Sequence, residues 1–141
     1  MSIDAGGPVE ELRVALAVYG DDLEPQEVTE LLGRRPSKSF RRGYVAGPRS
    51  PEMQHGAWFL EQEAVGTEDP GRVIGQLLSL LPSSRQIWVQ LNSRYKVQLR
   101  IAVHLNGWNN GFSFDAHTAE RIAATGAEVI FDIYSRDGNN D

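Results

Sequence analysis

The 141-residue chain contains no cysteine and only three histidines, His55, His104 and His117. The absence of cysteine excludes disulfide bonds and thiolate metal ligands. The histidines never occur at a metal-binding spacing such as HxH or HExxH. We therefore expect neither a metal site nor another cofactor.

Long hydrophobic runs are also missing, since no apolar stretch approaches the ~20 residues that span a bilayer. The acidic start Met1-Ser2-Ile3-Asp4 lacks the basic and apolar regions of a signal peptide. These two absences predict a cytoplasmic protein without a membrane segment. Apolar residues make up 40% of the chain and charged residues 23%, which is typical of a globular domain. We expect a single domain over residues 11–135, with a flexible arm at 1–10 and a flexible tail at 136–141.

Basic residues are few, but they are concentrated in one part of the chain. Of fourteen lysines and arginines, six fall between Arg34 and Arg49, and no acidic residue occurs from Arg34 to Pro51. The formal net charge of the whole chain is nevertheless -5. That acidic balance disfavours nonspecific nucleic-acid binding by the surface as a whole.

The first half of the chain alternates strand and helix signals. Residues 12–18 are apolar at every second position, and the intervening residues are nearly apolar too, which predicts a central strand. A helix follows with Glu24 near its N-cap and Pro25 in its first turn, and Gly33 is suited to its left-handed end. The segment after it resembles an extended edge strand or a long loop. Residues 57–61 predict another short strand.

The second half begins with a helix opened by Asp69-Pro70 and stopped by Pro82. Residues 83–92 fit either a strand or a helix, and we favour the helix. Residues 96–105 predict a strand with one wet face.

The Asn110-Gly111 turn predicts that Phe112-Ser113-Phe114 returns beside the 96–105 strand as a hairpin arm. Asp115 should cap a short helix that ends at Gly126. The final strand over 129–133 is apolar on both faces, so we predict that it is central as well.

This order of elements predicts an α+β fold in which helices pack on one face of a mainly antiparallel sheet, with ferredoxin-like character. Right-handed crossovers would place the first and last strands side by side in the middle of the sheet. Trp58 and Trp88 lie in apolar elements and are expected in the core.

Four short segments together resemble one bacterial family, the domain of unknown function family 4279. They are Val18-Tyr19-Gly20-Asp21-Asp22-Leu23-Glu24-Pro25 through Leu31-Leu32-Gly33, Gly56-Ala57-Trp58, Asn110-Gly111-Phe112-Ser113 and Phe131-Asp132-Ile133-Tyr134. The resemblance spans nearly the whole domain. It transfers no catalytic residue, and it implies a role for some members as small antitoxin or immunity partners.

The basic segment is the main candidate binding site. Its candidate residues are Arg34, Arg35, Lys38, Arg41, Arg42 and Tyr44. Cations with interleaved aromatics can dock on an acidic protein, on this protein's own acidic surface, or on phosphate and single-stranded nucleic acid. An ordinary solvated edge is the simplest interpretation.

Trp108 and Asn109 belong to a predicted glycine- and asparagine-rich loop. Trp108 there is either an exposed anchor for a partner or folded back over the sheet. Our leading hypothesis is a non-catalytic module that binds another protein through the basic segment and this loop. Binding of a phosphate ligand or nucleic acid by the same cations is the alternative.

Asp21 and Asp22 follow a strand and precede a helix, where paired carboxylates can bind a cation or act as acid and base. The simpler interpretation is a polar turn with helix-capping chemistry. A small hydrolase that uses Asp21, Asp22 and His104 is the third and weakest hypothesis, because nothing in the sequence brings these residues together.

Overall fold

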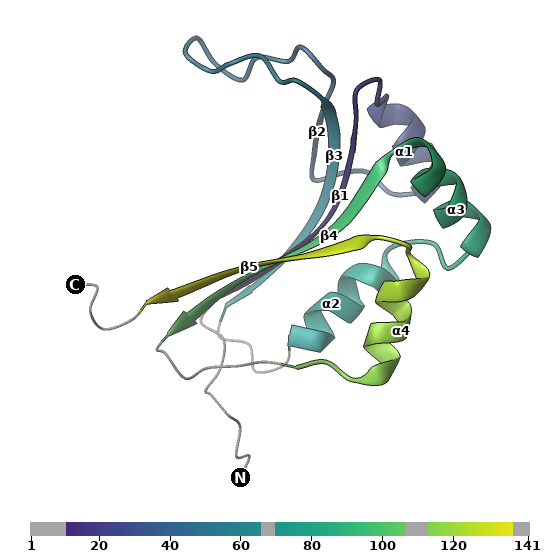
Figure 1. Cartoon of the computed structure of the whole chain (residues 1–141), viewed down its shortest axis with the longest axis vertical. Helices are drawn as coiled ribbons and strands as arrows, with labels where there is room; N and C mark the ends of the chain where they lie inside the picture. Colours follow the sequence, from purple (N-terminus) through teal and green to yellow (C-terminus); the bar gives the residue numbers. More distant parts are fainter. Residues whose placement is uncertain (1–10, 66–69, 107–112, 137–141) are drawn as a thin grey trace.

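The computed structural model describes residues 11–65, 70–106 and 113–136. Within them it has an α+β fold, which confirms the expected class: a five-stranded sheet carries four helices on one face (Figure 1). The elements follow the order β1 (Glu11–Gly20), α1 (Pro25–Leu32), β2 (Lys38–Phe40), β3 (Gly56–Val65), α2 (Pro70–Ser79), α3 (Arg85–Arg94), β4 (Lys96–Asn106), α4 (Ala116–Ala124) and β5 (Glu128–Arg136).

The strand order in the sheet is β2-β3-β1-β4-β5. β1 is antiparallel to both β3 and β4, β2 is antiparallel to β3, and β4 and β5 run parallel. The sheet is therefore mostly antiparallel, and the first strand is central, as predicted. The parallel pair is possible because α4 carries the chain back between β4 and β5.

One row of β1 side chains forms the middle of the hydrophobic core. Leu12, Val14, Leu16 and Val18 each have 0% of their surface exposed and lie beneath the helices. Trp58 on β3 joins the same core, and its indole nitrogen donates a hydrogen bond of 3.0 Å to the Thr29 hydroxyl of α1. Trp88 on α3 is also buried. The expected core positions of both tryptophans are confirmed.

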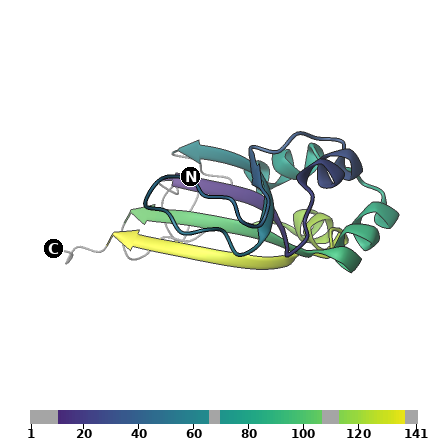
Figure 2. The same cartoon turned by 90° about the horizontal axis from the view of Figure 1, so that it is seen from above.

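The opposite face of the sheet is covered by none of the elements that the structure describes (Figures 1 and 2). We call it the open face. In one row across it, Ala17 of β1 stands between Phe59 of β3 and Gln98 of β4. Ala17 is fully buried because these larger neighbours flank its methyl group. The centre of the open face is thus built from small side chains with larger ones around them.

Three helix boundaries follow from capping residues. α1 starts at Pro25 and ends at Gly33, which has a φ of 68° in the left-handed region. α4 starts after Asp115, whose carboxylate accepts a 2.9 Å hydrogen bond from the Thr118 backbone N–H. That bond favours the ionised form and lowers the pKa of Asp115. The ambiguous segment 83–92 belongs to α3, so the choice of a helix there is confirmed.

The expected position of the last strand is wrong. β5 does not lie beside β1; it pairs with β4 at an outer border of the sheet (Figure 2). β4 itself occupies the place next to β1, because an antiparallel strand can pair there directly. The apolar residues on both faces of β5 therefore do not report a central strand.

The predicted hairpin arm is also wrong where the structure describes it. Ser113 and Phe114 are not in a strand, and both sides of β4 are already occupied, by β1 and β5. Phe114 instead packs against the core as a partly buried side chain. The Asn110-Gly111 turn, the arm 1–10 and residues 137–141 of the tail lie outside the described residues.

The left-handed backbone conformation of Gly33 at the end of α1 predicts that a side chain there lowers the stability of the domain. No atom lies within 4 Å of the position of an added Cβ, so Gly33→Ala meets no steric contact and costs only backbone strain. We expect a loss of about 1–2 kcal/mol in the free energy of unfolding, measured by urea denaturation. Gly47→Ala is the matched control, because the nearest atom to its added Cβ is 3.6 Å away and its φ is not in the left-handed region. Equal effects at the two positions would contradict this explanation.

Candidate functional site on the open face

The segment 41–55 is a structured loop that joins β2 to β3 and projects beyond the sheet on the side away from the helices (Figure 1). Gly43 N–H donates to the Met53 carbonyl, and Met53 N–H donates to the Tyr44 carbonyl, both at 2.8 Å. Val45 and Glu52 form an isolated antiparallel bridge farther out. These backbone bonds give the loop a hairpin-like base. We call it the β2–β3 loop.

Basic residues of the β2–β3 loop contact the acidic turn before α1. Arg41 donates from Nε to Glu24 Oε1 at 3.0 Å, and Arg42 lies 4.0 Å from Asp22. His55, at the other end of the loop, contacts Asp21. The hydrogen bond to Glu24 is also the main cause that raises the pKa of Arg41. This part of the basic segment therefore binds the protein's own acidic surface, which was one of the open alternatives.

The remaining basic residues diverge. Arg34 donates from Nε to the Leu80 carbonyl at 3.2 Å, so it is directed toward the helical layer. Arg35 and Arg49 are exposed. Lys38 lies on the open face with its Nζ 5.0 Å from the centre of the Phe59 ring. The predicted basic cluster is thus not one continuous cationic patch.

Four aromatic rings form a row from the open face onto the β2–β3 loop. Tyr19 packs edge-on against Phe59 at 5.7 Å, Phe59 lies 6.2 Å from Phe40, and Phe40 stacks on Tyr44 at 5.7 Å. Tyr44, at the loop end of the row, is 48% exposed. We call these four residues the aromatic row. With Lys38 above Phe59, it is an amphipathic surface in the part of the chain that the structure describes.

Sequence reasoning singled out Tyr44 and Lys38 but missed Tyr19 and Phe59. A local signal for both existed, because residues adjacent in a strand point to opposite faces. Trp58 in the core therefore places Phe59 on the open face, and buried Val18 does the same for Tyr19. The sequence alone could not show that strands β1, β2 and β3 bring these rings together.

Trp108 and Asn109 lie outside the described residues. The hypothesis that their loop shares a surface with the basic segment therefore stays a prediction. The aromatic row is formed by described residues alone, and it is the better defined candidate.

The hydrolase hypothesis conflicts with the sheet register. His104 pairs with Glu11 at one end of β1, whereas Asp21 and Asp22 follow Gly20 at the other end. A strand of this length separates the two ends by about 30 Å, so His104 cannot act on the same substrate atom as the aspartates. Within residues 11–65, 70–106 and 113–136, no group of three or more histidines and acidic residues could hold a metal ion.

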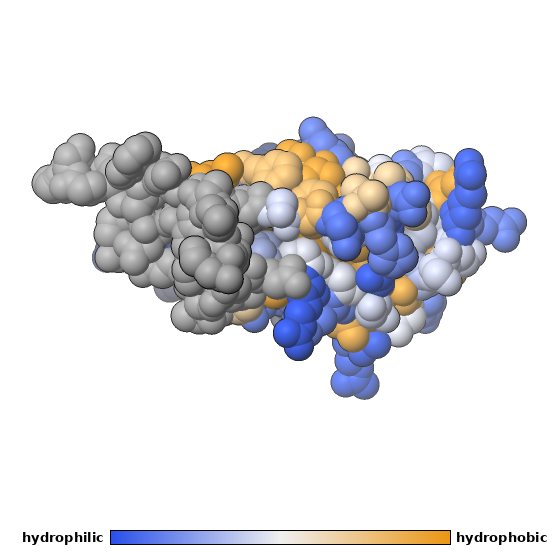
Figure 3. Space-filling view, turned by 90° about the horizontal axis from the view of Figure 1, so that it is seen from below, coloured by the Kyte–Doolittle hydropathy of each residue, from blue (hydrophilic) through white to orange (hydrophobic). Residues whose placement is uncertain are grey.

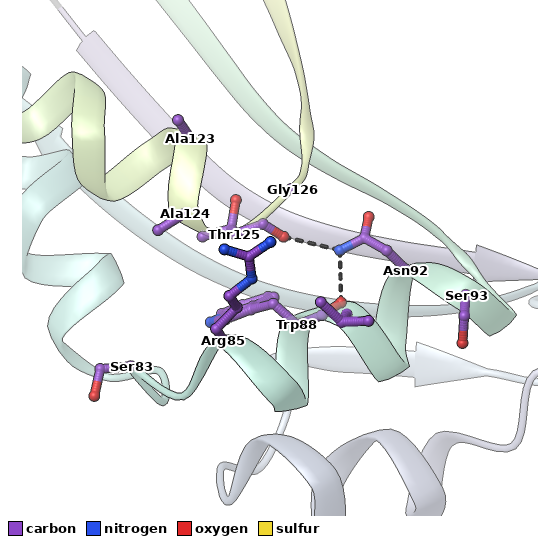
Figure 4. Close-up of a pocket in the computed structure, with 10 residues that line it drawn as sticks. Ser83, Arg85, Trp88, Asn92, Ser93, Ala123, Ala124, Thr125 and Gly126 are labelled. Atoms are coloured by element: carbon purple, nitrogen blue, oxygen red, sulfur yellow. Dashed lines mark hydrogen bonds between the residues drawn. The ribbon is translucent and has the colours of Figure 1, made fainter.

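A cavity of about 640 Å³ lies between α3 and the end of α4 (Figure 4). Hydrogen bonds of a residue in its lining connect the two helices. The Asn92 side-chain amide donates to the carbonyls of Trp88 at 2.8 Å and Thr125 at 2.9 Å, so both of its N–H groups are used. A Cβ on Gly126 would come within 2.8 Å of that amide. The lining contains Arg85 but no acidic residue and no histidine, so we find no catalytic pair there.

The fold and the candidate site define a small α+β domain whose helices cover one face of the sheet and whose other face carries an aromatic surface. Comparison with family models assigns it more closely: residues 10–136 match the model described as domain of unknown function (DUF4279), and the chain belongs to this family. No curated protein and no solved structure matches it. Among the described residues, no helix is long and apolar enough to cross a membrane.

The contacts between the β2–β3 loop and the acidic turn predict a local dynamic effect. Exposed ion pairs add little to global stability, but they restrict the groups that they join. Arg41→Ala should therefore accelerate hydrogen exchange of the Gly43 and Met53 amides while the melting temperature stays unchanged. High salt should act in the same direction on the wild-type protein, because it screens exposed charges.

The control for this experiment is Arg13→Ala, which removes an exposed ion pair with Glu63 on the open face. It should leave exchange in the β2–β3 loop unchanged. Protection of Gly43 and Met53 that does not respond to Arg41→Ala would show that the backbone bonds alone order the loop.

Proposed function

We propose that this domain is a non-catalytic protein-binding module of the cytoplasm that contacts its partner through the aromatic row and the β2–β3 loop. The observation that carries the proposal is the exposed Tyr44 ring at the end of a packed aromatic row. Tyrosine and tryptophan dominate binding energy at protein interfaces, because a rigid ring buries a large area at little entropic cost. A role as an immunity-type partner that binds and blocks a toxin is one form of this proposal.

The restricted mobility of the β2–β3 loop and the unpaired cations support the proposal. Backbone bonds at its base and the ion pair with the acidic turn restrict the β2–β3 loop, and a restricted loop loses less entropy on binding. Lys38, Arg35 and Arg49 have no acidic partner among the described ion pairs. Of the three, Lys38 lies over the Phe59 ring, so it favours a partner with an acidic group beside an apolar contact.

Binding of a phosphate ligand or single-stranded nucleic acid is the second candidate. Lys38 beside the Phe59 ring favours it, because such sites combine cations for the backbone with rings for the bases. Against it, Arg41 and Arg42 already contact Glu24 and Asp22, so fewer cations remain for phosphates. The protein partner is therefore our first choice.

The protein-binding proposal predicts that Tyr44→Ala weakens partner affinity about tenfold or more. The partner to try first is the product of the adjacent gene, purified and titrated against the domain by calorimetry. Val89→Ala is the control, because Val89 is comparably exposed, at 56%, but lies on α3 in the helical layer. An identified partner that binds both variants as tightly as wild type would exclude the aromatic row as its site.

The nucleic-acid alternative has its own test. Labelled single-stranded DNA and RNA are titrated with the domain at low salt and followed by fluorescence anisotropy. If the proposed protein-binding function is correct, no saturable binding appears. Saturable binding that weakens steeply with salt, and that Lys38→Glu abolishes, would favour the alternative.

A further inference from the structure

β5 forms an outer border of the sheet and is long for an edge strand. It covers nine residues, from Glu128 to Arg136, whereas the strand at the opposite border, β2, covers three. Natural edge strands are commonly short or carry proline or lysine, which prevent pairing with another chain. The sequence EVIFDIYSR contains neither proline, glycine nor lysine. The edge of β5 is therefore chemically suited to pair with a further strand.

β5 also exposes large apolar side chains. Phe131 is 46% exposed, Ile133 56% and Tyr134 53%, and they are half of the six large hydrophobic residues found exposed in the described chain. A view from below shows apolar surface gathered along the side of the molecule where β5 lies (Figure 3). Concentration of such residues on one edge marks an interaction surface rather than scattered surface hydrophobics.

The register places these side chains on both faces of the sheet. Phe131 pairs with Ile101 of β4 and Ile133 pairs with Val103, so both belong to the face that the helices cover. Tyr134 pairs with His104 and lies on the open face, where the two rings stack at 4.6 Å. A partner that covers only one face would leave apolar surface on the other. A strand added at the edge would contact both faces at once.

We propose that β5 pairs antiparallel with β5 of a second copy of this chain, about a two-fold axis at Phe131. A two-fold axis perpendicular to the sheet keeps each side chain on its own face, so residues of the same face meet across it. Phe131 then faces its own equivalent, and Val129 faces Ile133 of the second copy. On the open face, Ile130 faces Asp132 of the second copy. Val129, Phe131 and Ile133 thus each meet an apolar residue on the helix-covered face.

Repulsion between like charges disfavours a neighbouring register. An axis one residue further along, at Asp132, would place two aspartates directly opposite each other, and like charges in that position are destabilising. With the axis at Phe131, Glu128 instead faces the Tyr134 hydroxyl of the second copy, to which its carboxylate can bond. Asp132 keeps its own ion pair with Arg100, at 3.2 Å. No position of the pairing opposes two like charges.

The second copy is favoured over an unrelated strand because the sequence is complementary to itself. Val129, Phe131 and Ile133 form an apolar row that is symmetric about its middle residue. The paired sheets would be continuous from one β2 to the other. Both open faces would lie on the same side of the dimer, with the two aromatic rows at its far ends.

The test measures the molar mass of the full-length protein in solution by light scattering. Sedimentation measures the dissociation constant of the dimer. The wild type should be dimeric. Ile133→Arg should weaken the dimer at least a hundredfold, because it places a cation in the apolar row. Val89→Arg is the matched control, since Val89 is also 56% exposed but lies on α3, and it should remain dimeric. A monomeric wild type, or a dimer that survives Ile133→Arg, would overturn the proposal.

The register is tested by cross-linking, which the absence of native cysteine makes unambiguous. Phe131→Cys should form an intermolecular disulfide under mild oxidation, because residues opposite each other in antiparallel strands bring their Cβ atoms within about 5 Å. Ile133→Cys, which faces Val129, should not. Cross-linking of neither variant in a chain that is dimeric by mass would overturn pairing through β5. Cross-linking of Ile133→Cys alone would overturn the axis at Phe131.

Discussion

The structure depends on the burial of β1 between two antiparallel neighbours beneath a single layer of helices. Leu16 and Val18 are wholly buried because the helices cover their face, while Ala17 is buried between side chains of β3 and β4. A sheet packed on one side needs large residues on that side only. None of the described elements covers the second face (Figure 1), and the aromatic row occupies one end of it.

A second constraint is the local neutralisation of charge. The acidic turn before α1 contains Asp21, Asp22 and Glu24, whose charges near a helix N-terminus are favourable in themselves. The same turn contacts Arg41, Arg42 and His55 of the β2–β3 loop. Cations that look like a binding patch in the sequence thus serve in part to position the loop. The loop therefore exposes the Tyr44 ring rather than a continuous cationic patch.

The outcomes show which signals in the sequence carry spatial information. Caps and breakers such as Pro25, Gly33 and Asp115 act on neighbouring backbone, so they placed helix ends correctly. Alternation identified β1, β4 and β5 as strands, but it also predicted a hairpin arm at 112–114 that Ser113 and Phe114 do not form. The aromatic row was not predictable, because Tyr19 and Phe59 lie 40 residues apart and meet only through the pairing of β1 with β3. Strand order is a tertiary property, and no local pattern encodes it.

The wrong prediction of the position of β5 has the same origin, and it has a further consequence. A strand that is apolar on both faces indicates that both faces are buried, and within one chain this means a central position. β5 has that composition but lies at a border with Ile133 and Tyr134 exposed. In the proposed dimer, β5 would have a neighbouring strand on each side, so it would lie inside a continuous sheet rather than at its border. The pattern that misled the single-chain prediction is thus the one that an interface strand requires.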